Sequence, residues 1–229
     1  MPHVTAVIPA AGSGKRMGGN KSKQYLEIAS RPIIAHTLQV FQEASFVDDI
    51  ILVSPAAEIP FSRELVSNYG ISKVVSIAEG GAERQDSIKK GLETIESSTD
   101  IVIVHDGVRP FIKSDILKAS VNVALEYGAA LVAVPVKDTV KKVNGGSVIE
   151  TVPRNKLWLA QTPQTFSYDL IMAAYKNAFL KGIIGTDDAS LVEILGKEVR
   201  IVMGSYDNIK ITTPEDLLFA EAILKEKQL

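Results

Sequence analysis

The 229-residue chain contains no cysteine, which excludes both a disulfide framework and thiolate ligation of a metal. It has no apolar stretch near the roughly 20 residues that a membrane-spanning helix needs. Neither sign of charge predominates, because 25 Lys and Arg residues stand against 27 Asp and Glu residues. The net charge of -2 gives no overall attraction to nucleic acid or to an anionic membrane, so we expect neither as a partner.

Length and composition favour a single domain over residues 1–229. A hydrophobic content of 46% and a charged content of 23% are typical of a soluble globular protein. A chain of this length can bury one substantial core, and it shows no repeat, low-complexity tract or linker. Its first residues, "MPHVTAVIPA", carry neither the cationic nor the long apolar segment of a secretory signal, so we expect a cytoplasmic location.

Short apolar runs alternate with segments of helical periodicity along the chain. The runs are rich in Val and Ile, as in parallel strands covered on both faces, and occupy residues 5–9, 49–54, 73–77, 100–106 and 129–136. Helical patterns occupy residues 31–44, 63–70, 83–97, 114–128 and 213–227. We expect Ser114 and Gly128 to cap the fourth helix, and Thr213 to cap the last with Pro214 at its first position. The predicted fold class is α/β, a Rossmann-like, mostly parallel sheet flanked by helices.

Residues 137–158 break this pattern. They contain two short polar β segments around "NGGS", and Asn-Gly favours a hairpin because both residues tolerate positive φ. A two-stranded ribbon is marginally stable alone. We therefore predict a projecting β-hairpin arm that meets a second subunit and makes a homodimer.

A glycine-rich loop, "PAAGSGKRM", follows the first apolar run. Such loops after strands cradle phosphates, because bare backbone N–H groups can approach an anion there. The P-loop pattern fails, since Arg16 follows Gly14-Lys15 where Ser or Thr is required. The dinucleotide pattern fails at Met17, where a small residue is needed. Arg16 and Lys23, gathered near the glycines, suit the charge of a triphosphate.

Seven segments, taken in order, resemble the motifs of the 2-C-methyl-D-erythritol 4-phosphate cytidylyltransferase family: "PAAGSGKRM", "GGAERQDS", "HDGVRPF", "VKDTVK", "TVPRNKLWLAQTPQTF", "TDDAS" and "DNIKITTPEDL". The resemblance implies the nucleotide-diphospho-sugar transferase type of fold. It also implies transfer of CMP from CTP to 2-C-methyl-D-erythritol 4-phosphate, with release of pyrophosphate. The acceptor's phosphate would attack the α-phosphorus in line, while the protein holds two anions and neutralises the developing charge.

The same resemblance assigns residues to the co-substrate CTP. Gly81, Ala82 and Ser87 would read the cytosine, in a tight backbone pocket that excludes a purine. The full set of implied CTP-binding residues is Ala10, Ala11, Gly12, Gly14, Gly81, Ala82, Ser87 and Asp106. The implied catalytic residues are Arg16, Lys23, Arg154 and Lys210.

Asp106 follows a buried apolar run directly, where open α/β sheets place ligands. The resemblance implies that Asp106 helps to position Mg²⁺ or another divalent cation, together with Asp207, although magnesium often keeps phosphate oxygens and water as its ligands. An exposed pair of helix residues without a role in the site explains Arg84 and Asp86 as well as a functional role does. For Asp188 we favour a carboxylate that the dipole at a helix N-terminus stabilises.

The acceptor site is implied by residues from several motifs. Thr139 and Arg154 lie on the predicted arm and would bind the sugar phosphate in the neighbouring subunit, since the arginine fork suits a phosphate. The implied acceptor-binding residues are Asp106, Arg109, Thr139, Arg154, Thr186 and Lys210.

Three other functions fit parts of the sequence. Ribitol 5-phosphate is the alternative acceptor, because its cytidylyltransferases share similar segments. A short-chain oxidoreductase would use a Tyr-x-x-x-Lys pair, but Tyr69/Lys73 is interrupted by Gly70, and Tyr206/Lys210 lies in a strand-like segment. A non-catalytic nucleotide-binding module would have no use for Thr139, Arg154 and Thr186 together.

Overall fold

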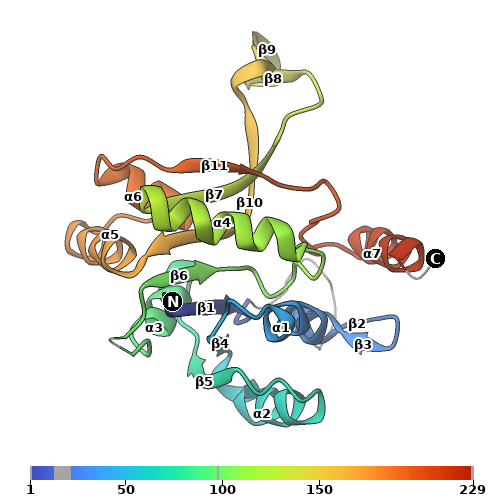
Figure 1. Cartoon of the computed structure of the whole chain (residues 1–229). Helices are drawn as coiled ribbons and strands as arrows, with labels where there is room; N and C mark the ends of the chain where they lie inside the picture. Colours follow the sequence, from blue (N-terminus) through green and yellow to red (C-terminus); the bar gives the residue numbers. More distant parts are fainter. Residues whose placement is uncertain (1, 13–21, 97, 228–229) are drawn as a thin grey trace.

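A seven-stranded mixed sheet runs through the centre of the molecule (Figure 1). The computed structural model describes residues 2–12, 22–96 and 98–227 and gives the strand order β11-β7-β10-β6-β1-β4-β5. The strands are β1 (Val4–Pro9), β4 (Asp49–Ser54), β5 (Val74–Glu79), β6 (Ile101–Val104), β7 (Ala129–Pro135), β10 (Trp158–Ser167) and β11 (Arg200–Met203). Within the described residues, β10 pairs antiparallel with β6 and β7, and the other pairs of this sheet are parallel. The predicted mostly parallel α/β sheet is therefore confirmed.

The apolar runs form strands because both faces of the sheet are buried. In β1, Ala6 and Ile8 pack into one core and Val7 packs into the other, and none of the three is exposed to solvent. This is the alternation that a pleated strand imposes when helices cover both sides.

Helices pack against both faces of the sheet. The core on one face contains side chains of α1 (Ile33–Glu43), α2 (Ile59–Asn68) and α4 (Ser114–Tyr127). The core on the other face contains side chains of α3 (Arg84–Leu92), α5 (Tyr168–Lys181) and α6 (Asp188–Ile194). A third, smaller core joins α7 (Pro214–Lys227) to the short strand β2 (Glu27–Ile28), at the side of the molecule where the C-terminus lies (Figure 1). Strand β2 pairs with β3 (Arg31–Pro32).

Two of the expected helix ends, Gly128 and Pro214, are confirmed. Gly128 ends α4 with a φ of 86°, and Pro214 is the first residue of α7. The expectation for Ser114 was wrong: it is the first residue of α4, and Lys113 holds the N-cap position without a side-chain hydrogen bond. Asp115 in the first turn supplies a negative charge near the helix N-terminus instead.

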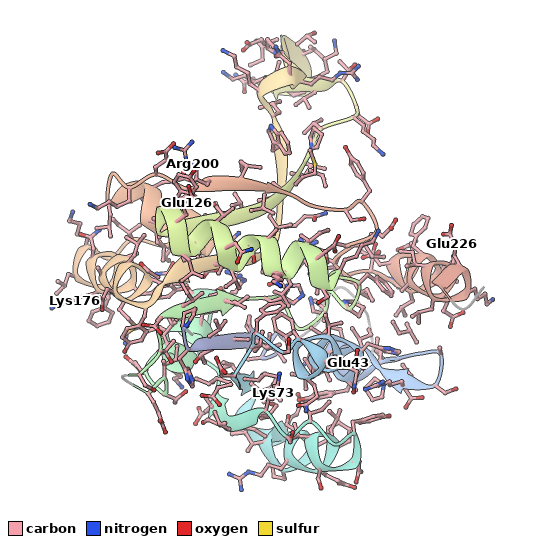
Figure 2. All side chains as sticks on the ribbon, in the orientation of Figure 1. Glu43, Lys73, Glu126, Lys176, Arg200 and Glu226 are labelled. Atoms are coloured by element: carbon pink, nitrogen blue, oxygen red, sulfur yellow. The ribbon has the colours of Figure 1, made fainter. Side chains whose placement is uncertain are left out.

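The hairpin arm stands clear of the body, with β7 and β10 leading to it (Figure 1). Strands β8 (Val140–Asn144) and β9 (Ser147–Val152) form a separate two-stranded sheet, and the short helix η4 (Arg154–Lys156) follows. The turn falls at Gly145 and Gly146, with φ values of 54° and 81°, so the two glycines rather than Asn144 take up the positive φ. Figure 2 shows the side chains of the arm extending away from the rest of the chain.

Candidate functional site

Two adjoining cavities lie where β1, β5 and β6 end, at the carboxyl edge of the sheet where α/β folds bind ligands. The larger has a volume of about 520 Å³ and is lined by Pro9, Ala10, Ala11, Gly12, Lys23, Gln24, Gly81, Ala82, Glu83, Arg84, Ser87, Asp106, Val108 and Lys210. The smaller has a volume of about 250 Å³ and is lined by Arg84, Asp106, Arg109, Ala160, Gln161, Thr162, Gln164, Thr186, Asp187 and Lys210. Arg84, Asp106 and Lys210 belong to both linings and so form a shared wall.

The larger cavity depends on glycines where two segments of backbone meet. A Cβ atom added to Gly80 would lie 2.2 Å from the Cβ of Ala11, and one added to Gly81 would lie 2.3 Å from the Cβ of Asp86. The backbone N–H of Ala10 donates to the carbonyl of Val53 at 2.7 Å, which fixes the opposite segment to β4. The cavity can be this narrow only because neither glycine carries a side chain.

Ser87 holds the end of this glycine segment. Its Oγ accepts a hydrogen bond from the N–H of Gly81 at 3.0 Å and donates one to the carbonyl of Glu83 at 3.1 Å. Because its only proton is donated within the protein, the hydroxyl can act toward a ligand only as an acceptor.

Lys23 reaches the larger cavity from the short helix η2 (Lys23–Tyr25). Tyr25 anchors this helix: its buried hydroxyl is 3.0 Å from the Oγ of Ser54 and 2.8 Å from the Oγ of Ser62, and those two oxygens are 2.8 Å apart. Burial raises the pKa of Tyr25, so the phenol stays protonated and the three hydroxyls remain hydrogen-bonded.

Asp106 is surrounded by three cations. Its Oδ2 lies 2.9 Å from Lys210 Nζ and 3.3 Å from Arg109 Nε, and its Oδ1 lies 3.3 Å from Arg84 Nε. Burial would raise the pKa of Asp106, but Lys210, Arg84 and Arg109 outweigh it and hold the pKa well below the usual range. The carboxylate therefore fixes three cations at the shared wall, and these cations can neutralise an anion.

His105 is linked to Asp106 through the hydroxyl of Thr162. Its Nδ1 lies 3.1 Å from the Oγ of Thr162, and the same Oγ accepts a hydrogen bond from the N–H of Asp106 at 3.0 Å. Its Nε2 lies 3.0 Å from the carbonyl of Arg109. Burial lowers the pKa of His105 to about 4, so the ring is neutral at physiological pH. His105 is therefore a structural neighbour of the site.

The smaller cavity has polar walls. Gln164 donates to Asp187 Oδ2 at 2.8 Å and accepts from the N–H of Ala189 at 2.8 Å, which joins β10 to the start of α6. Arg109 Nη1 donates to the carbonyl of Asn208 at 2.8 Å. A polar lining that also contains the cations Arg84, Arg109 and Lys210 suits a small polyhydroxy anion.

The predicted residues lie in different places. Ala10, Ala11, Gly12, Lys23, Gly81, Ala82 and Ser87 line the larger cavity, Arg109 and Thr186 line the smaller, and Asp106 and Lys210 line both. Thr139 and Arg154 lie on the arm, where Arg154 donates to the carbonyl of Lys137. Asp207 is exposed and lines neither cavity. Gly14 and Arg16 lie outside the described residues.

Direct coordination of a metal by Asp106 and Asp207 finds little support in the geometry. The described part of the chain holds no group of three or more His, Cys, Asp or Glu side chains that could bind a metal ion. Asp106 already contacts three cations through its two oxygens. These residues do not fit a metal site built by the protein alone.

The sequence alone does not indicate the contacts that Arg84 and Asp188 make at the site. Asp86 pairs with the N–H of Glu83 at 3.1 Å, whereas Arg84 reaches Asp106 and also Asp188, with Nη2 and Oδ2 2.8 Å apart. The segment "GGAERQDS" contains Arg84, but nothing in its local pattern indicates a partner so distant in the sequence.

The oxidoreductase pairs do not form. Tyr69 follows the end of α2, and Lys73 donates to the carbonyl of Ala44 at 2.7 Å. Tyr206 donates to the carbonyl of Pro135, while Lys210 contacts Asp106. Neither pair shares a helix face, which that chemistry requires.

In the described ranges, no helix combines the length and apolarity needed to cross a membrane.

Comparisons with known proteins agree with this geometry. Residues 4–226 match the family model for 2-C-methyl-D-erythritol 4-phosphate cytidylyltransferase. Proteins of that name from Geotalea uraniireducens and Geobacter metallireducens are 57% and 54% identical, over 97% and 98% of both chains. The crystal structure of 4-diphosphocytidyl-2C-methyl-D-erythritol synthase from Anaerococcus prevotii aligns with a TM-score of 0.87 at 32% identity, covering 98% of this chain and 96% of that one. The cytidylyltransferase structure from Thermus thermophilus aligns with a TM-score of 0.81 at 33% identity, covering 97% and 99%.

Proposed function

The chain belongs to the 2-C-methyl-D-erythritol 4-phosphate cytidylyltransferase family and transfers CMP from CTP to that acceptor, and we propose that its two cavities divide the substrates between them. The larger cavity takes CTP and the smaller takes the sugar phosphate. The wall shared by the two linings carries this proposal, because it is where the α-phosphorus and the attacking phosphate must meet. The names of the relatives do not favour ribitol 5-phosphate as the acceptor.

The reaction needs positioning more than covalent catalysis. A phosphate oxygen of the acceptor forms a new bond to the α-phosphorus, and the bond from that phosphorus to the bridging oxygen of the β-phosphate breaks. Pyrophosphate leaves with the electron pair of the broken bond. Lys210 and Arg109, fixed by Asp106, neutralise the charge that grows on the phosphoryl oxygens. Lys23 contacts the triphosphate from η2, and we assign the same role to Arg16.

A divalent cation would accompany the triphosphate in this proposal. When bound, such a cation neutralises phosphate charge. Such a cation would depend on the phosphates of CTP for its ligands, because Asp106 is engaged by three cations. The divalent cation and the cytoplasmic location stay predictions of the sequence.

A second copy of the chain completes the acceptor site in this proposal. Val143, Val148, Ile149 and Leu159, on the arm and at the base of β10, are 54%, 60%, 60% and 53% exposed. Apolar side chains gathered on a projecting ribbon are stabilised when another subunit covers them. The same contact would bring Thr139 and Arg154 to the neighbour's smaller cavity.

Thr186→Val tests the division of the substrates. Thr186 lines only the smaller of the two cavities, so the variant should raise the KM for the acceptor about tenfold and leave CTP binding, measured by calorimetry without acceptor, unchanged. Weaker CTP binding with an unchanged acceptor KM would refute the assignment.

A further inference from the structure

We propose that Arg84 is a further residue that contacts the reacting phosphates, and that Asp188 is the positioning residue that holds it at the junction of the two cavities. The inference rests on the proposed division of CTP and acceptor between those cavities. Arg84 is the first residue of α3, has a side chain 32% exposed, and lines both cavities.

Two carboxylates fix the guanidinium group. Arg84 Nε lies 3.3 Å from Asp106 Oδ1, and Arg84 Nη2 lies 2.8 Å from Asp188 Oδ2. Burial would lower the pKa of Arg84, but Asp188 and Asp106 outweigh it and raise the pKa, so the charge is permanent. Nη1 has no hydrogen-bond partner among the described residues, so both of its N–H groups can donate to an anion from a fixed planar group.

Asp188 is itself held rigidly. Its side chain is 1% exposed, and its Oδ1 accepts a hydrogen bond from the hydroxyl of Tyr175 at 2.5 Å. Burial, followed by the charge of Asp188, raises the pKa of Tyr175 well above its usual value, so the phenol remains a donor. One carboxylate oxygen of Asp188 accepts from Tyr175 on α5, and the other contacts Arg84. Asp188 therefore keeps the guanidinium group from rotating into a position where it pairs only with Asp106.

The charges of this ion-pair cluster support a role in the reaction. Three cations, Arg84, Arg109 and Lys210, stand against two carboxylates, Asp106 and Asp188, so the cluster itself carries one net positive charge. Fixed cations of this kind stabilise the transition state without reorganising during the reaction. The competing explanation is that Arg84 only neutralises the buried Asp188 during folding.

Kinetics of matched variants separate these explanations. Arg84→Gln should lower kcat for CMP transfer about 100-fold, with the KM for CTP changed only a few-fold. Asp188→Asn, which keeps the side-chain volume and an acceptor for Tyr175, should lower kcat about tenfold. The double variant should be no slower than Arg84→Gln, because Asp188 acts through Arg84.

Ser190→Ala is the matched control. Ser190 belongs to the capping interactions of Asp187 at the start of α6 and has no contact with Arg84, so the variant should lower the melting temperature and leave kcat unchanged. The proposal is overturned if Arg84→Gln keeps kcat within about threefold of wild type, or if the two substitutions act multiplicatively. Should Arg84→Gln fail to fold, Arg84→Lys, which keeps the charge and loses the fork, serves in the same comparison, with the same threefold limit on kcat. Thr186→Val, which does not alter Arg84, reports separately on the division of the substrates.

Discussion

Lys210 Nζ lies 2.9 Å from Asp106 Oδ2, at the wall that separates the two cavities. Lys210 follows β11, and Asp106 follows β6, so the pair joins the far end of the chain to the middle of the sheet. One carboxylate thus fixes an ammonium group where two phosphates would react.

Replacing Lys210 should slow the chemical step. Lys210→Met removes a positive charge from the developing phosphoryl charge, and we expect kcat/KM to fall 10²- to 10³-fold in a pyrophosphate-release assay. Lys176→Met is the control, because Lys176 is exposed on α5 and lines neither cavity. A loss of less than about threefold in Lys210→Met would contradict the role given to Lys210.

Gly80→Ala should weaken CTP binding at least tenfold in calorimetry, because the new Cβ would meet the Cβ of Ala11 at 2.2 Å and displace the wall of the larger cavity. Gly91→Ala is a matched control: its Cβ would meet Val7 and Val53 at 2.7 and 2.9 Å, in the core beneath α3. Both variants should lose stability, but only Gly80→Ala should lose affinity. Equal affinities in the two variants would show that Gly80 does not shape the nucleotide site.

Ser87→Ala should reduce the preference for CTP over UTP. The Ser87 hydroxyl donates its proton to Glu83 and so offers a ligand only an acceptor, which suits the amino group of cytosine and repels the carbonyl of uracil. We expect the ratio of kcat/KM for the two nucleotides to fall about tenfold. Ser120→Ala removes a buried hydroxyl bonded to Leu117 and Thr165 elsewhere, and it should leave the ratio unchanged.

Stability should fall as the pH drops from 6.5 toward 4. Burial holds the folded-state pKa of His105 at about 4, so the unfolded chain binds a proton in this window while the folded chain does not. The stabilisation from the neutral ring is complete above the unfolded pKa and is lost as the pH falls, by up to about 3 kcal/mol. Burial of His36 lowers its pKa too and adds to the loss. Urea unfolding of wild type and His105→Gln at several pH values measures the difference, and equal slopes would assign the effect to other groups.

Mixing two inactive variants should restore activity if the arm serves the neighbouring subunit. Arg154→Ala leaves the cavities intact, and Lys210→Met leaves the arm intact. After co-refolding, a mixed dimer has one complete site, so we expect about a quarter of wild-type activity. No recovery, with mixed dimers shown by sedimentation and mass spectrometry, would place Arg154 in its own subunit's site or outside the site.

The local features of this protein could be read from its sequence. Apolar runs rich in Val and Ile predicted β1, β4 and β7 to within one residue of their observed ends. A strand that is buried on both faces is a nearly continuous apolar run, so its ends can be recognised from composition. Gly128 was recognisable as a helix end, because a left-handed residue favours glycine. Ordered motifs along the whole chain indicated the family, which the comparisons confirmed.

Tertiary structure alone decided how charges pair at the site. Arg84 is not paired with its neighbour Asp86 but with Asp106 and Asp188, and Asp188 is a buried ion-pair partner as well as the first residue of a helix. The three cations around Asp106 come from the start of α3, the loop after β6 and the segment after β11. Periodicity and capping describe interactions within a few residues, whereas these contacts depend on the order of strands in the sheet. Only the folded chain brings such charges within a few ångströms, and only burial there makes their pairing obligatory.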